Sequence, residues 1–104
     1  MANRHRGEIE AELGGITRTL VLTLGALAEI EDAYGGEDLL AIAERFEKGR
    51  IKATDAVIVI GAGLRGAGEN ICNEEVASLS VEGGAATYVR IVADLLKATF
   101  DGSA

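Results

Sequence analysis

The stretch Ala56-Val-Ile-Val-Ile-Gly-Ala-Gly-Leu-Arg-Gly-Ala-Gly68 decides the fold, because it fits two opposite structures. Its apolar run is followed by Gly61, Gly63 and Gly66, at the G-x-G-x-x-G spacing of a dinucleotide-binding turn. In that structure Val57 to Ile60 would be a parallel strand, and a pyrophosphate would lie on the N-terminus of the next helix. In the alternative structure the whole stretch is a glycine-rich helix without a catalytic signature.

The residues that follow favour the helix. A nucleotide-binding turn needs an amphipathic helix directly after it, but Gly68 and the run from Asn70 to Asn73 interrupt any such pattern. An acidic residue, Glu82, falls at a tolerable distance, but it lies in a helical pattern. Too few residues remain for the βαβαβ half of such a fold. The dinucleotide-binding module is therefore the less favoured alternative.

A helix over this stretch would begin at Asp55, with Thr54 or a near neighbour as its N-cap. One face would then carry residues at i, i+3, i+4, i+7 and i+11, namely Val57, Ile60, Gly61, Leu64 and Gly68. The small residues let another helix approach closely, although each interior glycine costs roughly 0.5–1 kcal/mol relative to alanine. The residues predicted to contact other proteins are Gly61, Leu64, Arg65 and Gly68.

The N-terminal region predicts a β-hairpin. Residues 8–13 alternate strictly between glutamate and apolar side chains, which is typical of a half-buried strand. Gly14-Gly15 suits a two-residue turn, and residues 16–22 resume an extended pattern. In this register Leu13 faces Ile16, and Ile9 faces Leu20.

Four further helices are predicted. The first helix is capped by Thr23 and ended by Gly35-Gly36. The second helix follows Glu37-Asp38 and ends near Lys48-Gly49. A short helix is capped by Asn73, carries Val76 and Leu79 on one side and is ended by Gly83-Gly84. The last helix has one apolar face, formed by Tyr88, Ile91, Val92, Leu95, Leu96 and Thr99.

The predicted fold class is therefore α+β, with the N-terminal β-hairpin packed on a bundle of four to five short helices. We expect one domain over residues 7–101, with tails at 1–6 and 102–104.

Composition excludes several function classes. The net charge of −7 repels nucleic acid and anionic lipid, so no direct nucleic-acid contact and no membrane contact are expected. The only cysteine, Cys72, is expected to be buried or half-buried. One cysteine permits no intramolecular disulfide, which favours a cytoplasmic setting. Together with one histidine, His5, it cannot build a zinc site of the usual type. No segment reaches the ~20 apolar residues that span a bilayer, and no signal peptide opens the chain.

No enzymatic constellation is found either. The carboxylates of Glu29, Glu31 and Asp32 fan outward on a helix, so they are interpreted as a solvated face. Ser78 and Ser80 lack a histidine partner. We therefore predict a protein that is not an enzyme, with no catalytic residues, cofactor, metal or small-molecule substrate.

Several ordered blocks carry a family resemblance. They are Gly7-Glu-Ile-Glu-Ala-Glu-Leu-Gly-Gly, Leu22-Thr-Leu-Gly-Ala-Leu-Ala-Glu-Ile-Glu, Ile60-Gly-Ala-Gly-Leu-Arg-Gly-Ala-Gly, Glu74-Glu-Val-Ala-Ser-Leu-Ser-Val-Glu-Gly-Gly and Tyr88-Val-Arg-Ile-Val-Ala-Asp-Leu-Leu. Over residues 6–100 the chain resembles the small tail proteins of gene transfer agents, which are phage-like particles that package host DNA.

The resemblance implies a role in tail morphogenesis, either as a tail assembly chaperone or as a tail tube subunit. One hairpin and mostly helix suit a chaperone-like adaptor better, since a tube subunit usually carries larger sheets. The implied partners are other tail proteins of the tube or tape-measure type, and a second copy of the chain. The implied location is the cytoplasm during assembly, with the finished virion-like particle as the alternative.

Overall fold

The computed structural model describes residue 3 and residues 6–101. Strands β1 (Glu8–Leu13) and β2 (Ile16–Val21) are followed by five helices: α1 (Leu24–Ala33), α2 (Leu39–Glu47), α3 (Ala53–Gly66), α4 (Asn73–Ala77) and α5 (Ala85–Asp101). The predicted α+β class, a hairpin packed on a helical bundle, is thus confirmed. The predicted tails fall largely outside the described residues.

The hairpin has the predicted register. Strands β1 and β2 pair antiparallel, with Leu13 opposite Ile16 and Ile9 opposite Leu20. Gly14 and Gly15 have φ angles of 65° and 79°, as a type I′ turn requires. The Gly14 amide also donates to the Ser80 carbonyl at 2.8 Å, which attaches the turn to the segment after α4.

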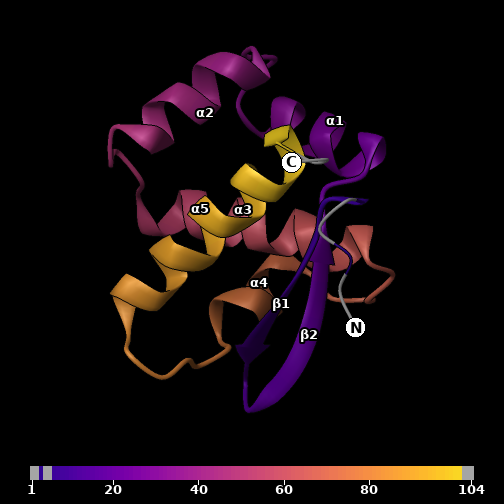
Figure 1. Cartoon of the computed structure of the whole chain (residues 1–104), viewed down its shortest axis with the longest axis vertical. Helices are drawn as coiled ribbons and strands as arrows, with labels where there is room; N and C mark the ends of the chain where they lie inside the picture. Colours follow the sequence, from indigo (N-terminus) through magenta and orange to yellow (C-terminus); the bar gives the residue numbers. More distant parts are fainter. Residues whose placement is uncertain (1–2, 4–5, 102–104) are drawn as a thin grey trace.

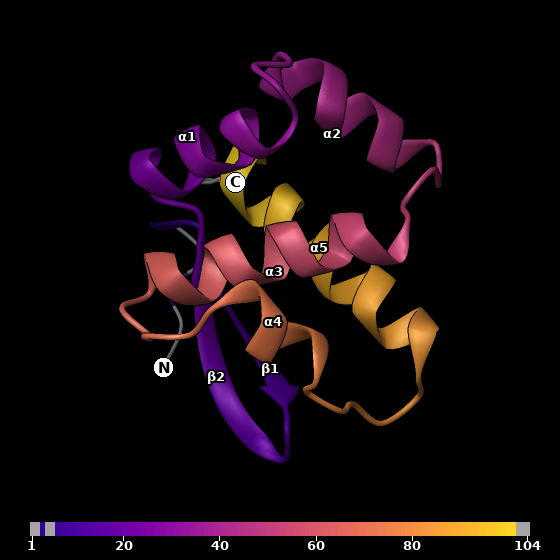
Figure 2. The ribbon, with the colours of Figure 1, turned by 180° about the vertical axis from the view of Figure 1, so that it is seen from behind.

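Helix α3 lies at the centre of the molecule (Figures 1 and 2). It packs against β2, α1, α4 and α5. Its side chains Val59, Ile60 and Leu64 are almost fully buried. The apolar run that resembled a parallel strand is therefore the core helix of this fold, and helix is confirmed over Val57 to Ile60.

The helix starts depend on side chains that accept hydrogen bonds from backbone amides. Thr23 caps α1 as predicted, accepting from the Ala26 amide at 3.1 Å, and Asp38 caps α2. The sequence predicts the cap of α3 at Thr54 or a near neighbour, with the helix starting at Asp55. The N-cap is the nearby Lys52 and α3 begins at Ala53, so the predicted start is too late. The Asp55 carboxylate accepts a hydrogen bond from the Lys52 amide at 2.7 Å. A carboxylate at the third helical position performs this role well.

Helix α4 also differs from the prediction. Its N-cap is Cys72 rather than Asn73, and the Glu75 carboxylate accepts from the Cys72 amide at 3.0 Å. This bond holds the pKa of Glu75 below its usual value. Cys72 is exposed, not buried or half-buried as expected.

The glycine pair Gly83-Gly84 does not end α4, which already ends at Ala77. Both glycines have positive φ and lie directly before α5. The last helix buries the expected apolar face through Ile91, Val92 and Leu95.

Candidate protein-interaction surface

The four residues predicted to contact other proteins have different environments in the chain. Gly61 and Leu64 are buried, and the Leu64 side chain is 0% exposed. Arg65 is partly buried, and Gly68 is exposed. Only Arg65 and Gly68 therefore offer accessible surface, and contact of any of the four with a partner stays a prediction.

The glycines of α3 serve contacts inside the molecule. A Cβ atom on Gly66 would lie 2.1 Å from the Val21 carbonyl oxygen of β2. On Gly63 it would lie 2.8 Å from a Leu95 methyl, and on Gly61 2.3 Å from Asn73 Oδ1. The close approach predicted for these glycines is thus made by β2, α5 and the start of α4.

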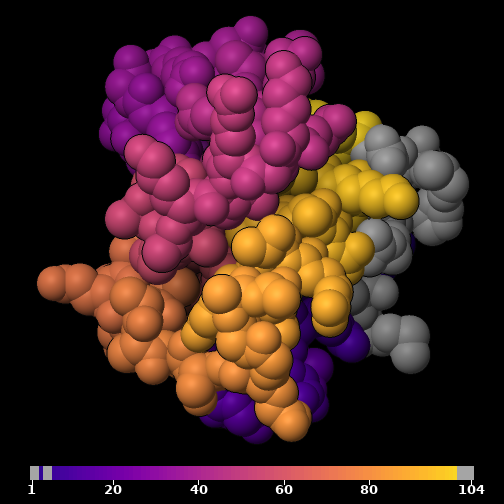
Figure 3. All heavy atoms as spheres, turned by 90° about the vertical axis from the view of Figure 1, so that its left-hand side faces the viewer, coloured from indigo at the N-terminus to yellow at the C-terminus, as the bar shows by residue number. Residues whose placement is uncertain are grey.

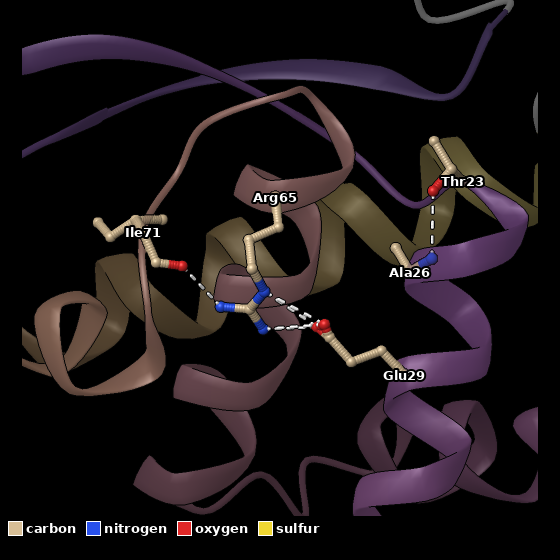
Figure 4. Close-up of polar contacts among 5 residues, drawn as sticks. All are labelled: Thr23, Ala26, Glu29, Arg65 and Ile71. Carbon is tan, nitrogen blue, oxygen red and sulfur yellow. Dashed lines mark hydrogen bonds and ion pairs between the residues drawn. The ribbon is translucent and has the colours of Figure 1, made fainter.

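Arg65 joins three segments (Figure 4). Its guanidinium binds the Glu29 carboxylate of α1, with an Nη2–Oε1 distance of 2.6 Å. Its Nη1 donates to the Ile71 carbonyl at 3.0 Å. This side chain therefore holds α1, α3 and the segment before α4 together.

Gly68 lies just beyond the helix. Its φ of 96° belongs to the left-handed region, in which glycine commonly ends a helix. The Gly68 amide donates to the Arg65 carbonyl at 3.0 Å. Gly68 therefore ends α3 and does not extend its face.

A second cluster of polar groups connects α1, α2 and α3. The Tyr34 hydroxyl donates to the buried carboxylate of Asp55, and the Arg45 guanidinium lies 5.4 Å from the centre of the Tyr34 ring. Burial and the Asp55 carboxylate raise the pKa of Tyr34 above its usual value. All the groups of this cluster are satisfied internally, so it stabilises the fold. Sequence reasoning missed it, because no local pattern joins Tyr34 to a residue 21 positions later.

The outer edge of β2 is exposed at Thr17 and Thr19, whereas at Val21 it is covered by α3, because Gly66 lies against the Val21 carbonyl. A two-residue turn makes Leu13 and Ile16 a hydrogen-bonded pair, so the amides of Thr17 and Thr19 point away from β1. Both residues are exposed, and within the described part of the chain no backbone hydrogen bond outside the hairpin involves either. Such an edge is a template for a further strand.

The surface also carries an apolar groove between α2 and α5. Its volume is ≈ 440 Å³, and the residues lining it are Ala43, Phe46, Glu47, Ile51, Ala93, Leu96, Lys97 and Phe100. We call this the α2–α5 groove. Ile51 also borders a second apolar hollow of ≈ 260 Å³ beside the start of α3. Figure 3 shows the side of the molecule on which α2 lies above α5.

Residue 3 and residues 6–101, which the structure describes, also lack two other features. No cluster of three or more potential metal ligands occurs in these ranges. None of the helices in the same ranges combines the length and the apolar character that crossing a bilayer requires.

An open strand edge and an apolar groove are the surface features of a protein that binds other proteins. The comparison with protein families agrees with a protein that binds other proteins. A family model described as "Phage tail tube protein, GTA-gp10" matches residues 6–102. The chain belongs to this family of phage and gene transfer agent tail proteins, which is structural and not enzymatic. No curated protein and no solved structure matches the chain.

Proposed function

We propose that this chain is a tail assembly chaperone, which holds an unassembled tail protein and is absent from the finished tail. The observation that carries the proposal is the open edge of β2 on a fold whose only described sheet has two strands. An unfinished tail protein exposes strand edges of its own, and a chaperone can protect them by adding a strand.

The exposed area of the chain suits a protein with one or two interfaces better than a subunit of a stacked ring. A stacked ring needs head-to-tail contacts within each ring and further contacts between rings, so each subunit uses four patches. At about 800 Å² per standard patch, these would cover roughly half of the 6109 Å² that the chain exposes. The large apolar side chains that are exposed in the described part of the chain are few, namely Ile16, Leu24, Leu40, Val89 and Phe100.

The second candidate is a tail tube subunit, which the description of the family favours. The same strand edge would then pair with a neighbouring subunit of the ring. A tube subunit forms rings or filaments as the concentration rises, whereas a chaperone remains a small oligomer.

Binding through the β2 edge is tested with a matched pair of proline variants. Thr17 and Glu12 lie directly opposite each other in the hairpin, and the amide of each points outward from it. Proline removes one such donor from β2 in Thr17→Pro and one from β1 in Glu12→Pro. Each variant is co-expressed with the tube and tape-measure proteins of the same particle, and the melting temperatures of both variants are compared.

We expect Thr17→Pro to lose at least tenfold in recovered tail protein, and Glu12→Pro to retain it. Equal recovery with both folded variants would contradict binding at the β2 edge. Failure of the wild-type chain to retain either tail protein would contradict the chaperone itself.

A further inference from the structure

Helix α5 carries two apolar stripes, of which one is buried in the core and the other is largely exposed. The buried stripe consists of Ile91, Val92, Leu95 and Ala98. The second stripe consists of Val89, Ala93, Leu96 and Phe100, none of which is fully buried. Both Val89 and Phe100 are among the large apolar side chains left exposed, at 42% and 45%.

The spacing of the second stripe is informative. Its residues follow one another at intervals of four, three and four, which is the spacing of the apolar positions in a coiled coil. A stripe of this period fits another helix laid along it at a shallow angle. The small residue Ala93, near its middle, allows the close approach of a second helix.

The α2–α5 groove runs beside this stripe. It contains a hollow, which Phe46 and Ile51 help to line, and a projecting aromatic ring, that of Phe100. Glu47 belongs to α2 and Lys97 to α5. Within the described residues neither side chain forms an ion pair. The same surface therefore provides a hollow and a projection, and an acidic and a basic flank.

A small molecule fits this groove poorly, because ligand pockets hold a few precisely placed polar groups. The buried charged group of the described chain, Asp55, is already bound to Tyr34 and to the Lys52 amide. In the groove the charged groups, Glu47 and Lys97, are exposed. A protein surface is the better occupant.

We propose that the occupant is a second copy of this chain, so that α5 of each copy packs along α5 of the other. A two-fold interface uses the same patch twice and must be complementary to itself. In this pairing Lys97 of one copy would lie against Glu47 of the second copy, and the reverse. Each Phe100 then enters the groove of the other copy.

The dimensions of the molecule are sufficient for this pairing. The chain measures 33 × 27 × 25 Å, so one side offers the area of about 800 Å² that a standard interface buries on each partner. The groove lies on a different part of the surface from the β2 edge, so pairing is compatible with the proposed binding of a tail protein. The pairing does not depend on that proposed function.

Sedimentation velocity of the full chain over a wide range of concentrations tests the pairing. We expect a dimer for the wild-type chain and at least a tenfold weaker association for Ala93→Glu, which places a charge in the stripe. The matched control is Ala28→Glu, on the exposed surface of α1, which should associate as the wild-type chain does. Circular dichroism establishes that both variants are folded.

A charge exchange supplies the second test. Glu47→Lys and Lys97→Glu should each weaken the dimer, and the double variant should restore it to within a few fold of the wild-type chain. A wild-type chain that stays monomeric would overturn the pairing, as would an Ala93→Glu variant that dimerises normally. Rings or filaments would also overturn it, because they require head-to-tail contacts. Rings or filaments would in addition favour a tube subunit over a chaperone, whereas the other two outcomes have no bearing on the retention of a tail protein in the proline experiment.

Discussion

Gly66 lies where α3 passes closest to the hairpin. A methyl group at this position would collide with the Val21 carbonyl, which belongs to a backbone that cannot move away easily. Gly25 is also helical, but a methyl group there would have its nearest neighbour, Thr23 Oγ1, at 3.9 Å. The two positions have the same conformation and opposite environments.

The effect of alanine should therefore have opposite signs at these positions. We expect Gly66→Ala to lower the free energy of unfolding by about 1–3 kcal/mol through overpacking. Gly25→Ala should raise it by about 0.5–1 kcal/mol, because alanine favours the helix. Urea denaturation of the two variants measures both changes. A Gly66→Ala variant as stable as the wild-type chain would contradict the close approach of Gly66 to the Val21 carbonyl.

The Tyr34 hydroxyl predicts a dependence of stability on alkaline pH. Its pKa in the folded chain is raised, first by burial and then by the Asp55 carboxylate, above the ordinary value of about 10. The unfolded chain therefore releases this proton first as the pH rises. The contribution to stability is fully present below about pH 10 and is lost as the pH rises through the folded pKa.

Removal of the hydroxyl should flatten this dependence. Above about pH 10, the free energy of unfolding should fall more steeply for the wild-type chain than for Tyr34→Phe. Denaturant titrations at several pH values measure the difference, and the other titrating groups are common to both proteins. Parallel curves would mean that the Tyr34 hydroxyl is neither buried nor bonded to Asp55 in solution.

At the scale of elements, Arg65 connects α3 to α1 and to the segment that precedes α4. Glu29→Gln removes only the charged partner, and the pair is 30% and 40% exposed, so we expect a loss of about 0.5–1 kcal/mol. Arg65→Met also leaves the Ile71 carbonyl without its donor, which should bring the loss to about 1–2 kcal/mol. Urea denaturation distinguishes the two values, and equal losses would mean that the bond to Ile71 contributes nothing.

The hairpin and most helices could be predicted from sequence because their signals are local. Alternating glutamates, two adjacent glycines and the cap at Thr23 each determine the structure within a few residues. The start of α3 was misplaced because Lys52 has no capping side chain of the usual type, and the capping group is the carboxylate of Asp55. Local pattern does not distinguish these two ways of starting a helix.

The candidate site was less predictable than the fold. A face of small and apolar residues on a helix fits the core of its own chain as well as a partner, and only the packing of β2 and α5 on α3 distinguishes these uses. The bonds of Arg65 to Glu29 and of Tyr34 to Asp55 join residues far apart in the sequence. A periodic pattern in the sequence does not predict which distant residues form such pairs.

At the scale of the whole molecule, the glycine-rich stretch folds into the central helix and leaves the surface to other elements. The outer edge of β2 and the α2–α5 groove lie on different parts of the chain. One surface can thus hold a tail protein while the other joins two copies. This division suits a protein that acts during assembly.

The composition of finished particles tests the chaperone role most directly. Quantitative mass spectrometry of purified particles would compare the number of copies of this chain with those of the known tail proteins. We expect the chain to be absent or far below one copy per tail ring, although it is abundant in the producing cell. Recovery at several copies per ring, in constant proportion to the length of the tail, would contradict the chaperone role and establish a tube subunit.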